Sequence, residues 1–230
     1  MKRILFGITL LILLSGLWTG YSLSSPQQTA PRGQRTDPTL LSSRINKAKD
    51  KGVTELIVPA PVPYLAEVSG LEEALANYAV FIGMPIDSTS IIVDPRNIMT
   101  YHRFKILEML SARARPNVGV PEELPTTLVP PKSDEIYVLE GGGTVVVDGV
   151  TVTQRGDYEY KKGEKYLLFV SRNLAQSTAM VNLGQYGVFI VKGDSVEGIV
   201  REPTPLKRDI SERFANKTDN LIAALKKRKQ

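Results

Sequence analysis

The chain contains a single histidine, His102, and no cysteine, and this limits the chemistry that its side chains can perform. One histidine suffices for a Ser-His-Asp triad, but no Gly-x-Ser-x-Gly nucleophile motif accompanies it. Zinc sites draw mainly on histidine and cysteine, which this chain almost lacks. Calcium binding by oxygen ligands alone is left as an alternative, although no Asp-x-Asp-x-Asp-Gly loop is present. We therefore predict no catalytic, cofactor-binding or metal-binding residue. We interpret His102 as a partly buried strand residue that shares a face with Phe104 and Ile106 by strand alternation, and as a candidate for ligand or partner contact.

Two short segments have compositions that resemble functional sites. Asp157-Tyr158-Glu159-Tyr160 combines carboxylates with aromatic rings, as sugar-binding and glycosidase surfaces do. Paired catalytic acids must face each other about 5 to 10 Å apart across a cleft, however, which neighbours in a sequence do not establish. Glu140-Gly141-Gly142-Gly143-Thr144 lacks the Gly-Lys-Ser/Thr of a phosphate-binding loop. We interpret the first segment as a solvated turn and the second as a bend or bulge at a barrel corner.

A long proline-rich connection is a candidate partner-binding segment. It runs from Ser111 to Asp134 and contains five prolines, with Arg113 and Arg115 at its start. Compact domains rarely keep loops of this length without a use, and proline lowers the entropy cost of binding. Arg113 and Arg115 are therefore candidate ligand or partner contacts. The alternative is a tolerated insertion.

The C-terminal segment 203–230 is predicted to be an amphipathic helix, interrupted near Asn216, with a basic end. Each basic residue near an anionic membrane surface contributes about 1 kcal/mol to binding. The end is therefore a candidate membrane-surface contact. An ordinary cationic helix terminus that complements the helix dipole is the alternative. The basic residues are Lys226, Lys227, Arg228 and Lys229.

The N-terminal residues predict where the protein works. Lys2 and Arg3 precede an uncharged run from Ile4 to Trp18, which is shorter than the about 20 residues that a membrane-spanning helix needs. We predict that residues 1–23 are a signal peptide and that the protein is exported, to the periplasm or the exterior. An uncleaved membrane anchor is the alternative. A lipoprotein is excluded because there is no cysteine to acylate.

The net charge of +5 does not indicate a nucleic-acid partner. Two of the basic residues lie in the predicted signal, and four lie in the C-terminal run. The remaining body is close to neutral, whereas nucleic-acid binding needs a basic surface.

The N-terminal part of the folded region is predicted to be helical. After a flexible spacer at 24–36, a helix starts with Asp37 as its N-cap and ends at Gly52. Its apolar stripe consists of Leu40, Leu41, Ile45 and Ala48. A short edge strand is expected at 56–58. Ser69-Gly70-Leu71-Glu72 has capping-box spacing for a second helix, which ends near residue 77. We assign 37–69 to this N-terminal extension.

Residues 70–202 are predicted to form a β domain. In the clearest pattern, Asp148-Gly149 joins two β-branched runs as a hairpin over 144–153. The regular spacing of strands favours a mainly β fold, a small antiparallel barrel or sandwich of OB-like type with flanking N- and C-terminal helices. Further strands are expected at 78–84, 99–110, 135–140, 165–170, 179–183, 188–191 and 196–200.

Three strand patterns carry a resemblance to a known group. They are Ala79-Val80-Phe81-Ile82-Gly83, Tyr101 to Leu110 and Gly163 to Phe169. Between about Leu71 and Val200 the chain resembles uncharacterised exported bacterial proteins with an OB-like β-barrel, related in outline to netrin-like and metalloproteinase-inhibitor domains. The resemblance implies the fold and assigns no functional residue. Inhibitors of that type use an N-terminal cysteine and disulfides, which this chain lacks.

These observations together predict an exported, non-enzymatic binding or accessory module at the cell envelope that needs no cofactor. Its partner is an unidentified envelope protein or ligand. One alternative is a hydrolase-type enzyme that uses carboxylates or His102 in a cleft at the barrel mouth. Another is a membrane-anchored structural protein, which requires that the signal is retained.

Overall fold

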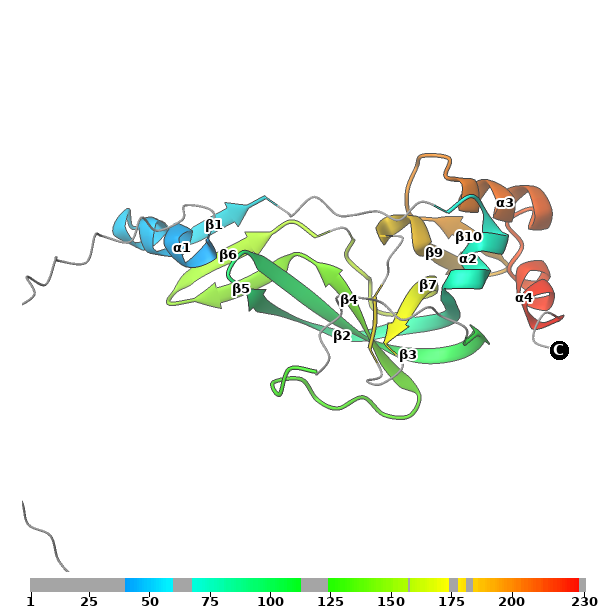
Figure 1. The fold of residues 1–230 in the computed structure, drawn as a ribbon, viewed down its shortest axis with the longest axis horizontal. Helices are drawn as coiled ribbons and strands as arrows, with labels where there is room; N and C mark the ends of the chain where they lie inside the picture. Colours follow the sequence, from blue (N-terminus) through cyan, green and yellow to red (C-terminus); the bar gives the residue numbers. More distant parts are fainter. Residues whose placement is uncertain are drawn as a thin grey trace, which may run out of the picture. The chain divides into compact units, whose positions relative to one another are not determined.

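The computed structural model of this protein describes residues 40–59, 68–112, 124–156, 158–173, 178–180 and 184–227 (Figure 1). The strands are β1 (Glu55–Val58), β2 (Ala79–Asp94), β3 (Asn97–Ser111), β4 (Glu135–Gly141), β5 (Gly143–Val147), β6 (Val150–Gln154), β7 (Lys165–Asn173), β8 (Thr178–Met180), β9 (Val188–Lys192) and β10 (Ser195–Gly198). The helices are α1 (Leu41–Asp50), α2 (Leu71–Asn77), α3 (Pro205–Phe214) and α4 (Thr218–Lys227), and a 3₁₀ turn, η1 (Gly184–Gly187), precedes β9.

The strands form two sheets. The smaller sheet has the order β1-β6-β5, and the larger has the order β10-β9-β7-β2-β3-β4-β8, with a further pairing between β7 and β8. Strand β1 runs parallel to β6, and β4 runs parallel to β8, whereas the other pairs are antiparallel. The predicted mainly β class with helices at both ends is confirmed. Of the two expected architectures, the two-sheet arrangement corresponds to the sandwich.

The hairpin β2–β3 forms the centre of the larger sheet, and its first strand is longer than predicted. The pattern predicted a strand only over 78–84, because Pro85 and the polar residues after Ile86 do not read as a strand. The structure continues β2 to Asp94 through a register shift between Pro85 and Asp87. A bulge at this point accommodates the proline within the strand.

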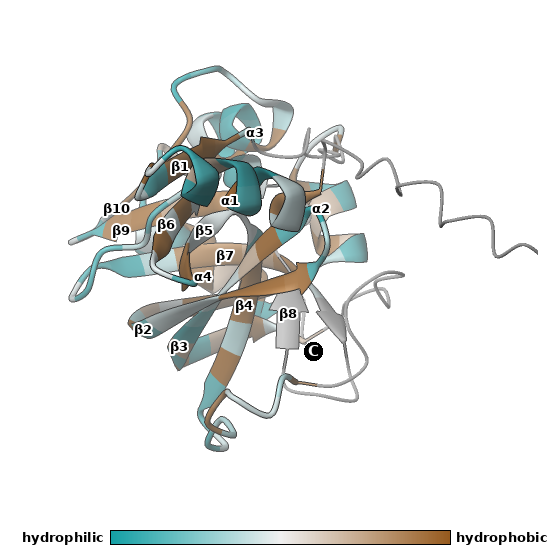
Figure 2. Cartoon of the chain, turned by 90° about the vertical axis from the view of Figure 1, so that its left-hand side faces the viewer, coloured by the Kyte–Doolittle hydropathy of each residue, from teal (hydrophilic) through white to brown (hydrophobic). Residues whose placement is uncertain are grey.

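Helices α2, α3 and α4 cover one face of the larger sheet. Alternation along β2 directs Val80 and Ile82 into the core beneath these helices, and directs Ala79 and Phe81 to the opposite core. In Figure 2, brown hydrophobic positions lie along β4 and β9.

The predicted interruption of the C-terminal helix is confirmed. Ala215, with φ of 49°, ends α3, and α4 begins at Thr218.

Helix α1 packs on the smaller sheet, as its predicted stripe requires. Its buried residues Leu41, Ile45 and Ala48 share a core with Val150 and Val152 of β6. The predicted start was too early, because the helix begins at Leu41 and has Leu40 in the N-cap position. The Asp37-Pro38 pair itself lies outside the described residues.

The start of α2 differs by one residue from the predicted capping box. The backbone N–H and the hydroxyl of Ser69 donate to Glu73 Oε2 at 2.7 and 2.8 Å, not to Glu72. The reason is that Gly70, not Ser69, occupies the N-cap position, so Glu73 takes the third helical place. A second cap comes from α3, because Leu71 N–H donates to Asp209 Oδ2 at 2.8 Å.

The buried amide of Gln154 connects the two sheets. Its Oε1 accepts a hydrogen bond from Ile98 N–H at 2.7 Å, and its Nε2 donates to Pro59 O at 3.1 Å and Arg96 O at 3.3 Å. Gln154 belongs to β6 of the smaller sheet, while Ile98 belongs to β3 of the larger one. The side chain is only 2% exposed, so water cannot replace these contacts.

We expect Gln154→Met to lower the free energy of unfolding by about 2 kcal/mol, because an apolar side chain leaves these buried backbone groups without their partner. Chemical denaturation at pH 7 measures the effect. The matched control is Arg155→Met at the next position, which is exposed and should change the free energy of unfolding by less than about 0.5 kcal/mol. Equal effects of the two substitutions would contradict this role of Gln154.

Candidate functional site

The register of three neighbouring strands brings polar side chains together on one face of the larger sheet. Ser88 of β2 lies opposite His102 of β3, and one row further Ser90 lies opposite Thr100. Thr100 in turn lies opposite Glu140 of β4. Because cross-strand partners point to the same face, these five residues form one polar patch.

This patch is the floor of a cleft of about 660 Å³. The Gly-rich connection from β4 to β5 and the segment that follows β6 provide the remaining walls. The lining residues are Ser88, Ser90, Thr100, His102, Glu140, Gly141, Gly142, Gly143, Thr144, Thr153, Gln154, Arg155, Gly156, Tyr158 and Glu159.

The Gly-rich segment is the predicted bend, and it carries the chain from the larger sheet to the smaller one. Thr100 Oγ1 donates to Gly142 O at 2.7 Å, so the 2.8 Å contact between the hydroxyls of Ser90 and Thr100 has Ser90 as the donor. A β-carbon on Gly143 would lie 2.2 Å from Thr100 Oγ1. The absence of a side chain therefore permits the close approach of the bend to β2 and β3.

His102 is buried in the floor of the cleft and has unused hydrogen-bonding capacity. Only 8% of the residue is exposed, and its ring packs edge-on against Tyr160 with the centroids 4.8 Å apart. Neither ring nitrogen forms a hydrogen bond to another described residue. Burial lowers the pKa of His102 from 6.5 to about 4, so the imidazole is neutral at pH 7. The predicted strand face shared with Phe104 is confirmed, because the rings of both residues pack against Tyr160.

The segment 158–160 is not the solvated turn that we expected. Tyr160 is buried, and its ring lies 4.9 Å from that of Phe104 and 5.1 Å from that of Tyr166. Its hydroxyl donates to Glu140 Oε1 at 2.5 Å, and burial together with this carboxylate raises the pKa of Tyr160 well above its ordinary value. The prediction was wrong because the segment closes one core of the sandwich. Glu159 is exposed, and Asp157 lies outside the described residues.

Glu140 is a site residue that its sequence pattern did not indicate as functional. It was interpreted only as the start of the Gly-rich segment. The signal was a charged residue at the end of a strand, two positions after Val138 and four after Ile136 on the same buried face. With Glu140 and Glu159, the cleft combines His102 with two carboxylates. Such a convergence of a histidine and two acids in one cleft favours the hydrolase alternative.

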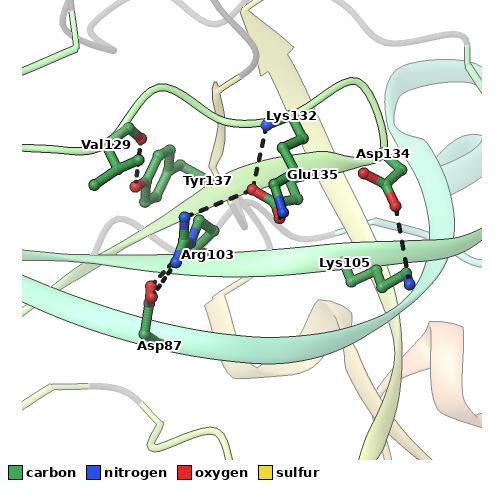
Figure 3. A network of polar contacts seen from close by, with 8 residues as sticks. All are labelled: Asp87, Arg103, Lys105, Val129, Lys132, Asp134, Glu135 and Tyr137. Carbon is green, nitrogen blue, oxygen red and sulfur yellow. Dashed lines mark hydrogen bonds and ion pairs between the residues drawn. The ribbon is translucent and has the colours of Figure 1, made fainter.

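A second polar network holds the described end of the proline-rich segment, residues 124–134, on the sheet (Figure 3). The Arg103 guanidinium bonds to Asp87 and lies 3.7 Å from Glu135 Oε2. The hydrogen bond to Asp87 raises the pKa of Arg103. Glu135 Oε2 accepts from Lys132 N–H at 3.2 Å, and the Tyr137 hydroxyl donates to Val129 O at 2.9 Å. This part of the segment is therefore anchored.

The structure describes only some of the other candidate contact residues. Arg113 and Arg115 lie outside the described residues, as do Arg228 and Lys229. Lys226 forms a 2.5 Å ion pair with Glu108 of β3, and Lys227 is exposed. The structure therefore pairs one of the two described tail lysines with the sheet.

The predicted signal 1–23 and spacer 24–36 also lie outside the described residues. Among the helices in the described ranges, none has the length and apolar character needed to cross a membrane. Within the same ranges, no group of three or more histidine, aspartate or glutamate residues is arranged to hold a metal ion.

Comparisons of the chain with family models, with curated proteins and with solved structures found no match. The resemblance to exported proteins with an OB-like domain therefore stays a prediction.

Proposed function

We propose that this protein is an exported, non-enzymatic binding module of the cell envelope that takes a small polar ligand in the cleft above His102. The observation that carries the proposal is the state of this histidine. It is more than nine-tenths buried, it lines a cleft of about 660 Å³, and its nitrogens have no hydrogen-bond partner among the described residues. Ring nitrogens that line a cleft and have no protein partner are available to bind a ligand or water there.

The volume and the lining of the cleft support the same function. Small-molecule sites span about 300 to 1,000 Å³, and a few well-placed polar groups give them specificity. The floor residues belong to paired strands, and the Ser90–Thr100–Gly142 hydrogen bonds fix the wall. A site on rigid elements is already organised before the ligand arrives, which reduces the entropy cost of binding.

Export is the second component of the proposal, and it rests on the sequence. Lys2 and Arg3 followed by the short apolar run to Trp18 are typical of an export signal. Because the chain has no cysteine, it has no disulfide, and the stability of the fold depends on the hydrophobic core.

A hydrolase-type enzyme is the second candidate, because His102, Glu140 and Glu159 share the cleft. Ser88, directly opposite His102 in the register, is the nearest hydroxyl that such chemistry could use. Against this function, no hydrogen bond joins His102 to Ser88 or to Glu140 in the described part of the chain. A triad depends on both contacts.

The cleft is tested by a screen of polar small molecules against the full chain, with the imidazole resonances of the only histidine as reporter. We expect at least one compound to shift these resonances. Ser88→Trp, which fills the cleft, should remove the shift, whereas Thr89→Trp, on the opposite face of the same strand, should keep it. Failure of every compound to shift His102 would overturn the proposal. Conversion of a bound compound into products in the same spectra would favour the hydrolase.

A further inference from the structure

We infer that the ligand of the cleft is a neutral saccharide; this inference rests on the proposed function and names its ligand class. The first argument is the chemistry of the walls. The described lining residues supply hydroxyls, carboxylates, an imidazole, a phenol and a guanidinium, and none of them has an aliphatic hydrocarbon side chain. The hydrogen-bonding groups therefore lie beside the carbon surface of the same short side chains and of the glycine backbone. A ligand that has both hydroxyl groups and an apolar C–H face matches such a lining.

The charge of the lining is the second argument. The described lining residues include two carboxylates, Glu140 and Glu159, and one guanidinium, that of Arg155. Sites for phosphate or carboxylate ligands concentrate arginine, lysine or helix N-termini, so an anionic ligand does not fit this balance. The Glu140 carboxylate in the floor would also repel it.

The protonation state of His102 is the third argument. At neutral pH the imidazole has one nitrogen that donates a hydrogen bond and one that accepts. An ammonium group only donates and a phosphate mainly accepts, so each would satisfy at most one of the two nitrogens. A sugar hydroxyl donates and accepts, which makes it the complementary group for a neutral, buried imidazole.

Tyr158 supplies an aromatic surface beside these polar groups. It is half-buried, it lines the cleft, and its ring is held edge-on by Tyr160 at 5.2 Å and by Tyr166 at 6.1 Å. A sugar ring has an apolar C–H face as well as polar edges. An immobilised phenol ring offers this face a contact at low entropy cost.

The test is isothermal titration calorimetry of the full chain at pH 7 with probes of three charge classes. The neutral probes are cellotriose, maltotriose and triacetylchitotriose, the anionic probe is glucose 6-phosphate, and the cationic probe is spermidine. We expect a neutral oligosaccharide to bind and both charged probes to fail. His102→Phe retains the ring contact with Tyr160 and removes both nitrogens, so it should weaken saccharide binding about 10-fold.

Ser88→Trp and Thr89→Trp serve again as the matched pair, because both positions are exposed and neither substitution disturbs the core. Saccharide binding should be lost in the first and kept in the second. If only glucose 6-phosphate or spermidine binds, and Ser88→Trp abolishes it, the saccharide inference is wrong and the binding cleft stands. If a saccharide binds equally well to Ser88→Trp, the inference is also wrong. If neither the probes nor the small-molecule screen shifts His102, the proposed function fails as well.

Discussion

The free energy of unfolding should fall by about 3 kcal/mol between pH 6.5 and pH 4 through His102 alone. Burial lowers the pKa of this imidazole from 6.5 to about 4 in the folded protein. One pKa unit corresponds to about 1.4 kcal/mol, so this lowering of the pKa corresponds to about 3 kcal/mol. No other group in the described chain combines such burial with a pKa that is lowered through this pH range.

The sign follows from proton uptake. Above pH 6.5 the imidazole is neutral in both the folded and the unfolded state, and the full stability is present. Between pH 6.5 and 4 the unfolded chain binds a proton that the folded protein excludes, so acidification favours unfolding. Below pH 4 both states are protonated, and this contribution is completely lost.

Chemical denaturation at several pH values, in the wild type and in His102→Phe, measures the effect. Carboxylates titrate in the same range, so the difference between the two proteins isolates the histidine. We expect the wild type to lose about 3 kcal/mol relative to His102→Phe on going from pH 7 to pH 4. Because the chain has one histidine, its NMR titration gives the folded pKa without assignment. A pKa near 6.5 in the folded protein would contradict the burial of this residue.

The sequence was sufficient where local patterns determine structure. The hairpin is one example, because Asp148 and Gly149 both adopt the positive φ that the Asp-Gly pair predicts. The position of His102 on a strand face with Phe104 is another, since alternation needs no knowledge of the partner strand.

The cleft could not be predicted because it depends on contacts between distant segments. Glu140 reaches Tyr160 across 20 residues, and Thr100 reaches Gly142 across 42. The register of β2 against β3 places Ser88 opposite His102, yet the polar end of β2 has no strand pattern of its own. Tyr158 and Tyr160 read as a solvated turn, because a sequence window cannot show which core a tyrosine will enter.

The second large effect is expected at the Gly-rich bend that forms the cleft wall. Gly142→Ala and Gly143→Ala should each lower the free energy of unfolding by about 3 kcal/mol. Gly142 has φ of 93°, and an added β-carbon would lie 2.5 Å from Gly156 Cα. That neighbour is backbone, so relief of the contact requires a shift of the segment after β6.

At Gly143, φ is 133°, and the added carbon would meet the Ser90 and Thr100 hydroxyls at 2.4 and 2.2 Å. Rotation of the Thr100 hydroxyl away from this carbon would break its hydrogen bond to Gly142 O. Strain and a lost buried hydrogen bond therefore add at this position.

The adjacent Gly141 provides the control for both substitutions. It does not have a positive φ, and nothing lies within 4 Å of an added β-carbon, so Gly141→Ala should change the free energy of unfolding by less than about 0.5 kcal/mol. Chemical denaturation of the three variants at pH 7 makes the comparison. A similar small loss in all three would mean that the bend adapts easily, and the cleft wall would then not be the rigid element on which preorganised binding depends. If only Gly142→Ala and Gly143→Ala lower the free energy of unfolding strongly, the backbone conformation that forms the cleft wall also stabilises the fold.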